Sequence, residues 1–258
     1  MQGGESVNEE KRPSTMRSLE RAIDVLEVLE RSGTPLRLSE VAREADLHVA
    51  TTQRILTVLE GRGRVEHDAS GYRTGVAMLF GAHAYLTTSR VALAAPVILQ
   101  QLADATGLTS SVFVRAGISR AAVARVEGTD PLRYVLPLGE RLPLYLGAGK
   151  ALAAYLEPSE LDEVFKGKDA FTRADGTTVT LGDFHRELEA VRATGWTLSR
   201  DERVIGTTAV AAPVLSPSGA CLAAVQVAGP SHSQTFEDTT SLGYEVRNAA
   251  AALAARLG

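Results

Sequence analysis

The segment from Gly147 to Lys150 forms a glycine-rich turn in front of an expected helix, a pattern that can hold a ligand. It reads Gly147-Ala148-Gly149-Lys150. It lacks the spacing of a nucleotide-hydrolysing phosphate loop, and Ala151 stands where that loop needs a hydroxyl group. Small residues let a ligand approach the backbone, and free N–H groups at a helix N-terminus attract anions. The segment therefore predicts either a carboxylate site without a charged side chain or only close helix–sheet packing.

The other reactive side chains form no catalytic or metal-binding group by their spacing. His185 and His232 are isolated, without the short His or Cys spacings of a metal site. Cys221, the single cysteine, begins an apolar strand and is expected in the core. We therefore expect no catalytic residue, no metal, no cofactor and no enzyme activity.

The neighbouring acids Asp201 and Glu202 are poorly placed to share a proton. Consecutive residues of an extended segment point to opposite faces, so the two carboxylates should not meet. We expect them at a pocket rim or on the surface, with Arg200 and Arg203 as counter-charges.

A second group of polar residues could read the edges of DNA bases. A helix is expected over 49–60, and its N-terminal residues would reach into a major groove. Gln can pair with adenine, Arg with guanine, and a Thr methyl group can contact thymine. The exposed residues predicted to contact bases are His48, Ala50, Thr51, Gln53 and Arg54. Arg62, Arg64 and Arg73 are expected at phosphates, with Arg73 near the tip of a hairpin.

The elements around these residues are typical of a winged helix-turn-helix. Helices are expected over 18–32, 39–45 and 49–60, followed by short strands at 65–67 and 72–74. In the first helix, Leu19, Ile23, Leu26 and Leu29 form the apolar stripe expected to be buried. The same layout also serves as a protein-interaction module. Residues 47–75 hold four Arg and three acids, so one subunit alone should bind DNA weakly.

The C-terminal half alternates strands and helices, which indicates an α+β domain with a mainly antiparallel sheet flanked by helices. Strands are expected at 110–115, 120–127, 133–137, 197–199, 208–215 and 221–228. Helices are expected over 76–89, 94–105, 149–156, 158–165, 181–194 and 235–257.

Composition limits the class of protein. The chain has 258 residues, 45% of them hydrophobic, and a net charge of −4. This length allows two domains, and a single cysteine fits a reducing compartment. The start of the chain has no apolar signal region, and no apolar run reaches membrane-spanning length. We expect a cytoplasmic protein with no membrane partner.

Four segments in order, at 18–30, 36–75, 139–156 and 188–230, resemble the IclR family of bacterial transcriptional regulators. They read SLERAIDVLEVLE, LRLSEVAREADLHVATTQRILTVLEGRGRVEHDASGYRTG, GERLPLYLGAGKALAAYL and LEAVRATGWTLSRDERVIGTTAVAAPVLSPSGACLAAVQVAGP. One departure is Val49-Ala50, where the family often has Lys-Ser at the start of the recognition helix. The segment PLYLGAGK also stands one residue shorter than the common form.

The resemblance implies a winged helix-turn-helix, a linker helix and a GAF-like effector domain, assembled as a dimer or tetramer on a palindromic operator. Applied to this chain, it implies a disordered lead-in over 1–15, a DNA-binding domain over 16–75, a linker helix over 76–90 and an effector domain over 91–258. The effector-binding residues it implies are Gly147, Ala148, Ser199, Thr207 and Ala209, with Leu142 and Leu144 expected as an apolar wall.

The hypothesis from the sequence is a repressor of transcription that responds to a small organic acid, expected to be a carboxylate. Two other functions stay open. The C-terminal domain could be an enzyme with the N-terminal unit as a docking module, or the chain could be a constitutive DNA-binding oligomer without an effector.

Overall fold

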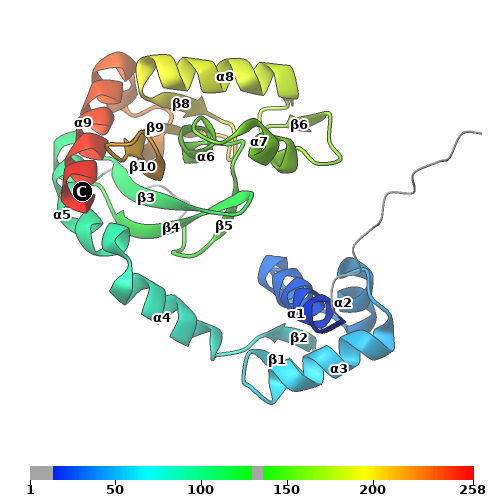
Figure 1. The fold of residues 1–258 in the computed structure, drawn as a ribbon. Helices are drawn as coiled ribbons and strands as arrows, with labels where there is room; N and C mark the ends of the chain where they lie inside the picture. Colours follow the sequence, from blue (N-terminus) through cyan, green and yellow to red (C-terminus); the bar gives the residue numbers. More distant parts are fainter. Residues whose placement is uncertain (1–13, 130–135) are drawn as a thin grey trace, which may run out of the picture. The chain divides into compact units, whose positions relative to one another are not determined.

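The computed structural model describes residues 14–129 and 136–258, and the chain divides into two compact units at Ala84 and Tyr85. The lead-in expected over 1–15 and the strand expected over 133–137 fall largely outside the described residues. Figure 1 shows a helical N-terminal unit and a C-terminal unit built on a curved sheet.

The N-terminal unit contains three helices and a two-stranded hairpin. The helices are α1 (Ser14–Arg31), α2 (Leu38–Glu44) and α3 (Val49–Glu60). The antiparallel strands β1 (Val65–Asp68) and β2 (Gly71–Thr74) follow. Together they form the expected winged helix-turn-helix. The helix α4 (Met78–Thr88) then runs across the division between the units.

The helix α1 buries only part of the expected stripe. Leu29 is buried and Leu26 packs against the same core, whereas Leu19 and Ile23 are 58% and 48% exposed. Val25 and Val28, outside the expected stripe, are buried with Leu56 of α3. Apolar residues lie on more than one face of this helix, so periodicity alone does not show which of them pack inward. The helix α2 begins at Leu38, one residue before the expected start at 39, and Glu40 accepts the N–H of its N-cap residue Arg37 at 2.6 Å.

The C-terminal unit is built on a six-stranded antiparallel sheet with the order β5-β4-β3-β10-β9-β8. The bounds of its strands are β3 (Thr109–Ala116), β4 (Ser119–Val126), β5 (Arg141–Pro143), β8 (Thr197–Arg200), β9 (Thr207–Leu215) and β10 (Cys221–Pro230). A separate hairpin pairs β6 (Ala170–Thr172) with β7 (Thr178–Thr180). The strand β5 and this hairpin were not predicted; each of their strands has only three residues.

Helices pack on both faces of this sheet (Figure 1). One face is covered by α5 (Arg90–Thr106) and α9 (Thr239–Leu257), with the 3-10 turn η1 (Gln234–Phe236) before α9. The helices α6 (Ala148–Ala153), α7 (Pro158–Val164) and α8 (Leu181–Thr194) contribute the core of the other face. Each face therefore has its own hydrophobic core.

Gly243 lets α9 pack closely against the indole ring of Trp196. A Cβ atom at this position would lie well inside van der Waals contact with that ring. We expect Gly243→Ala to lower the free energy of unfolding by about 1–3 kcal/mol, because the helix must move away from the ring. Gly81→Ala in α4 is the matched control, since its Cβ would find no atom closer than 4.0 Å. Urea denaturation measures both variants, and equal effects of the two substitutions would contradict the packing explanation.

Candidate functional site

The helix α3 presents the predicted base-contacting residues at its N-terminus. His48, Ala50 and Arg54 are exposed, and Thr51 is half-buried. Gln53 is also half-buried, and its amide lies 3.4 Å from the hydroxyl of Tyr72 in β2. The side chains at the start of α3 therefore share one accessible surface, with Gln53 turned toward the wing.

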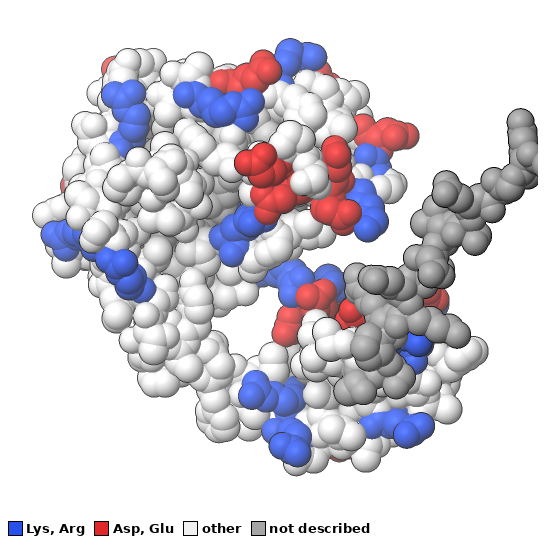
Figure 2. Space-filling view, in the orientation of Figure 1, with Lys and Arg blue, Asp and Glu red and all other residues white. Residues whose placement is uncertain are grey.

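Sequence reasoning missed Arg21, which lines a groove between α1 and α3 together with Thr51 and Arg54. Arg21 lies in the middle of an exposed helix face, and nothing in the sequence indicated that it lies near Thr51 and Arg54. On the face of the N-terminal unit shown in Figure 2, acidic side chains gather over α1, and basic ones lie at several places around the unit.

The phosphate contacts predicted for the arginines after α3 differ in their surroundings. Arg62 and Arg64 are exposed. Arg73 lies opposite Glu66, two residue pairs from the Asp68–Gly71 pair at the turn, and not at the tip itself. Its guanidinium contacts both Glu66, at 3.3 Å, and Asp68. These carboxylates offset its charge, which disfavours the phosphate contact predicted for Arg73.

A cavity of about 700 Å³, measured out to its open mouth, lies on one face of the C-terminal sheet. Its lining includes five of the seven residues predicted for effector binding, namely Leu142, Gly147, Ser199, Thr207 and Ala209. The other two, Leu144 and Ala148, are fully buried in the core beside it.

The backbone N–H groups expected to hold an anion are already occupied. Gly147 donates to Glu202 Oε2 at 3.0 Å, and Ala148 donates to Gln226 Oε1 at 3.2 Å. Gly149 lies so close to Arg120 that a Cβ atom would be 2.6 Å from its Nη1 atom. The helix α6 also has only six residues. The glycines thus serve close packing here, and the expected anion site at free N–H groups is corrected.

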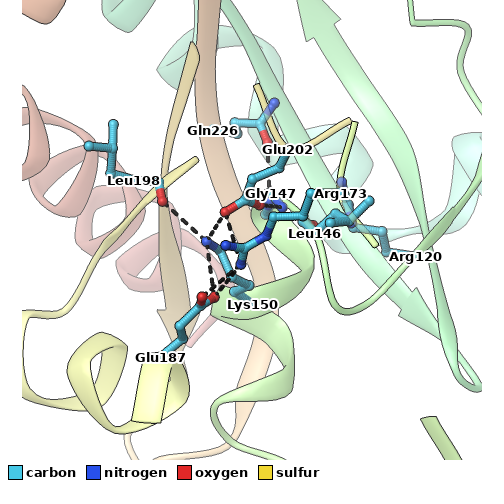
Figure 3. Close-up of polar contacts among 10 residues, drawn as sticks. Arg120, Leu146, Gly147, Lys150, Arg173, Glu187, Leu198, Glu202 and Gln226 are labelled. Atoms are coloured by element: carbon cyan, nitrogen blue, oxygen red, sulfur yellow. Dashed lines mark hydrogen bonds and ion pairs between the residues drawn. The ribbon is translucent and has the colours of Figure 1, made fainter. Parts of the chain in front are cut away.

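Glu202 is buried in the lining of the cavity, so the part of the expectation that placed it on the surface is wrong. It is 6% exposed, and its Oε1 atom lies 2.5 Å from Lys150 Nζ and 3.3 Å from Arg173 Nη2 (Figure 3). Lys150 also contacts Glu187 at 3.4 Å and donates to the Leu198 carbonyl at 3.2 Å. Two cations and two carboxylates therefore compensate one another beside the cavity, and Glu202 is part of its lining.

The neighbouring Asp201 points elsewhere, as expected, but the reason is a turn and not the alternation of an extended segment. Its carboxylate accepts the Gly206 N–H at 2.6 Å, in a turn where Asp201 has a φ of 55°. Arg203 lies 3.7 Å from Glu140, and the counter-charges of Glu202 are Lys150 and Arg173.

Three arginines that sequence reasoning did not assign to the site line the cavity: Arg120, Arg125 and Arg203. Arg120 is 3% exposed, and its Nη1 atom donates to the carbonyls of Pro143 and Leu146 (Figure 3). Burial, with the nearby charge of Arg203, lowers the pKa of Arg120 to about 9. Its side chain remains a cation at neutral pH, without a carboxylate in contact among residues 14–129 and 136–258.

Several buried polar atoms in this lining have no hydrogen-bond partner. Within the part of the chain that the structure describes, these atoms are Ser199 Oγ, Arg120 Nε and Arg125 Nε. Buried donors without partners are uncommon in folded proteins, and a site for a polar ligand is one explanation. Ser199 was predicted as such a donor from the resemblance, whereas the arginines gave no sequence signal beyond their place in an apolar strand.

Cys221 lies half-buried at the start of β10, beside the core under α6. Burial raises the pKa of its thiol to about 11. Since the thiolate is the reactive form, we expect alkylation by iodoacetamide at pH 8 to be at least about 100-fold slower than for a free thiol. The rate should rise about tenfold per pH unit up to the pKa. Mass spectrometry of native and urea-unfolded protein measures this, and equal rates in the two states would contradict it.

Metal ligands do not cluster in the described residues, since no group of three or more His, Cys, Asp or Glu side chains there could hold an ion. None of the described helices is both long and apolar enough to cross a bilayer.

Comparison with known families decides what these two units are. A model of the IclR helix-turn-helix domain matches residues 18–69, and a model described as the bacterial transcriptional regulator IclR C-terminal matches residues 83–255. The chain belongs to the IclR family of transcriptional regulators. The recognition from sequence and the expected fold class are both confirmed.

Relatives of this IclR-family chain include the HTH-type transcriptional repressor AllR of Escherichia coli. It is 31% identical over 246 residues, which cover 93% of this chain and 90% of AllR. A solved IclR-family regulator from Silicibacter has a TM-score of 0.81 and 25% identity, covering 93% of this chain and 96% of that one. An IclR homolog from Microbacterium hydrocarbonoxydans, solved in complex with 4-hydroxybenzoate, has a TM-score of 0.69 and 20% identity, covering 93% and 98%.

Proposed function

We propose that this IclR-family protein is a DNA-binding repressor whose C-terminal unit binds a small organic acid and thereby changes its affinity for an operator. In this proposal residues 16–75 read DNA, 76–90 form a linker helix and 91–258 form the effector domain. The organic acid is a carboxylate. The protein acts in the cytoplasm as a homodimer or tetramer.

The observation that carries the proposal is the arginine-lined cavity with unpartnered donors. A carboxylate accepts hydrogen bonds from Ser and Arg donors and offsets the charge of a buried guanidinium. Ser199 Oγ and Arg120 Nε offer such donors in one cavity. The 4-hydroxybenzoate bound to the Microbacterium homolog is itself a carboxylate, which supports this class of effector.

DNA binding is supported by the accessible start of α3 and by the repressor relatives. His48, Ala50 and Arg54 are exposed there, next to a wing formed by β1 and β2. Residues at these positions of a recognition helix contact base edges in the major groove.

Assembly into an oligomer is supported by apolar side chains that the single chain leaves exposed. The helix α4 has no buried residue, and its Leu79 and Phe80 are 65% and 68% exposed. A second copy could cover them, and two copies would place two reading helices on a palindromic site.

In the experiment, this protein is titrated into fluorescently labelled DNA taken from beside its own gene, and binding is measured by fluorescence anisotropy. The titration is repeated in the presence of each of a panel of small organic acids. The proposal expects sequence-specific binding that one acid weakens or strengthens. Specific binding that no acid changes would remove the effector part, and binding without sequence preference would remove the operator part.

A further inference from the structure

The strand β4 brings two arginines to the same face of the sheet although their spacing predicts opposite faces. Arg120 and Arg125 are five residues apart, an odd number, and side chains alternate along a strand. Val112 of β3 pairs with Ala124 of β4, while the next residue, Phe113, pairs with Ala122. The residue of β4 between Ala122 and Ala124 is therefore an extra one and forms a β-bulge. The bulge reverses the alternation, and both arginines line the cavity.

Each of these guanidinium groups is held in place by its own set of partners. Arg120 donates to the carbonyls of Pro143 and Leu146. Arg125 donates to the Leu136 carbonyl at 3.1 Å and contacts the exposed Glu127 at 3.4 Å. Their Cα atoms are about 15 Å apart at the ordinary rise of a strand. Because both are held, they cannot easily converge on one small anionic group.

Both guanidinium groups also keep a buried donor for a ligand. The Nε atoms of Arg120 and Arg125 have no hydrogen-bond partner among the described residues, and the two side chains are buried or nearly so. The acid nearest to the cavity floor, Glu202, is already bound by Lys150 and Arg173. The cavity therefore has two separate cationic sites. Arg120 contacts no carboxylate among the described residues, and Arg125 contacts the exposed Glu127, which lies outside the lining and leaves Nε of Arg125 without a partner.

We infer that the effector is a dicarboxylate, with one carboxylate at Arg120 and Ser199 and the second at Arg125. This inference rests on the proposed function and narrows its effector class. A dicarboxylate has two separate carboxylates, each with one negative charge, and each of them can bind one of the two arginines. A compact dianion such as phosphate would reach only one arginine.

The test uses the full-length protein and a series of probes that differ only in the second charge. The probes are succinate, glutarate, adipate and pimelate, each compared with its monomethyl ester by isothermal titration calorimetry. For the best-fitting length, the diacid should bind at least about tenfold more tightly than its monoester. Phosphate should compete poorly with it.

Variants separate the two carboxylate sites. Arg125→Gln should weaken binding of the diacid about tenfold or more and leave the monoester nearly unchanged. Arg186→Gln, an exposed arginine on α8 with 72% side-chain exposure, is the control and should change neither. Circular dichroism and melting of each ligand-free variant exclude misfolding as the cause.

The outcomes distinguish this inference from the proposed function. A monoester that binds as tightly as its diacid, or an Arg125→Gln variant that loses both equally, would overturn the dicarboxylate and leave an organic-acid effector standing. Phosphate that competes as well as the best diacid would also overturn it. Failure of every diacid and every monoester to bind would overturn the dicarboxylate together with the proposed effector.

Discussion

Replacing Lys150 by Met is expected to lower the free energy of unfolding by about 3 kcal/mol, which is the largest stability effect of the changes considered. The substitution leaves Glu202 buried without its cation at 2.5 Å. Arg173 remains 3.3 Å from the Glu202 carboxylate. The loss of stability therefore stays near the lower end of the range for a broken buried ion pair. For a unit of this size, the melting temperature should fall by roughly 6–12 °C.

A double-mutant cycle shows whether the pair itself is responsible. Glu202→Gln removes the charge but keeps an acceptor for the Gly147 N–H group. The double variant Lys150→Met with Glu202→Gln should therefore lose less stability than the sum of the single variants. Urea denaturation of all four proteins measures this. Additive losses would mean that Lys150 and Glu202 do not stabilise each other.

Replacing Arg54 by Ala is expected to weaken operator binding by roughly 1–3 kcal/mol per reading head, or more than tenfold for a dimer. The side chain is exposed at the start of α3, where a bidentate contact with guanine is possible. Binding to non-specific DNA should change much less. Fluorescence anisotropy on operator and on scrambled DNA measures both affinities.

Two other arginines provide the contrast for Arg54. Arg62→Ala should weaken binding to operator and scrambled DNA alike and lower the salt slope by about one unit, because a phosphate contact carries no sequence information. Arg31→Ala, at the end of α1 and bonded to Glu27 at 3.1 Å, should change neither. An operator affinity that Arg54→Ala leaves unchanged would contradict the assignment of α3 as the recognition helix.

Much of the fold could be predicted because its elements are long and have clear boundaries. The helix α3 occupies the predicted 49–60, and α8 occupies the predicted 181–194. Each helix is bounded by residues that favour a helix start or a helix end. One of these is Gly195, which follows α8 in the left-handed conformation. Which apolar residues of α1 pack inward could not be predicted, because this depends on which partner helices cover them.

The candidate site was less predictable because its contacts join distant segments. The residues themselves suggested a ligand site at Gly147, whereas Ser199 was assigned to a pocket only through the family resemblance, and both line the cavity. The burial of Glu202 could not be predicted, because its partner Lys150 lies 52 residues away in the chain. The arginines of β4 share a face only because of the bulge, which no local pattern in the sequence indicates.

The central claim is that the effector cavity and the operator surface are energetically coupled. Coupling is reciprocal, so operator DNA must change the affinity for the acid by the same factor by which the acid changes the affinity for operator. The most direct measurement is the dissociation constant of the best-binding acid, taken by calorimetry with and without saturating operator DNA. The account predicts a change of at least about fivefold that matches the reciprocal titration. An acid that binds equally well to free and operator-bound protein would contradict it.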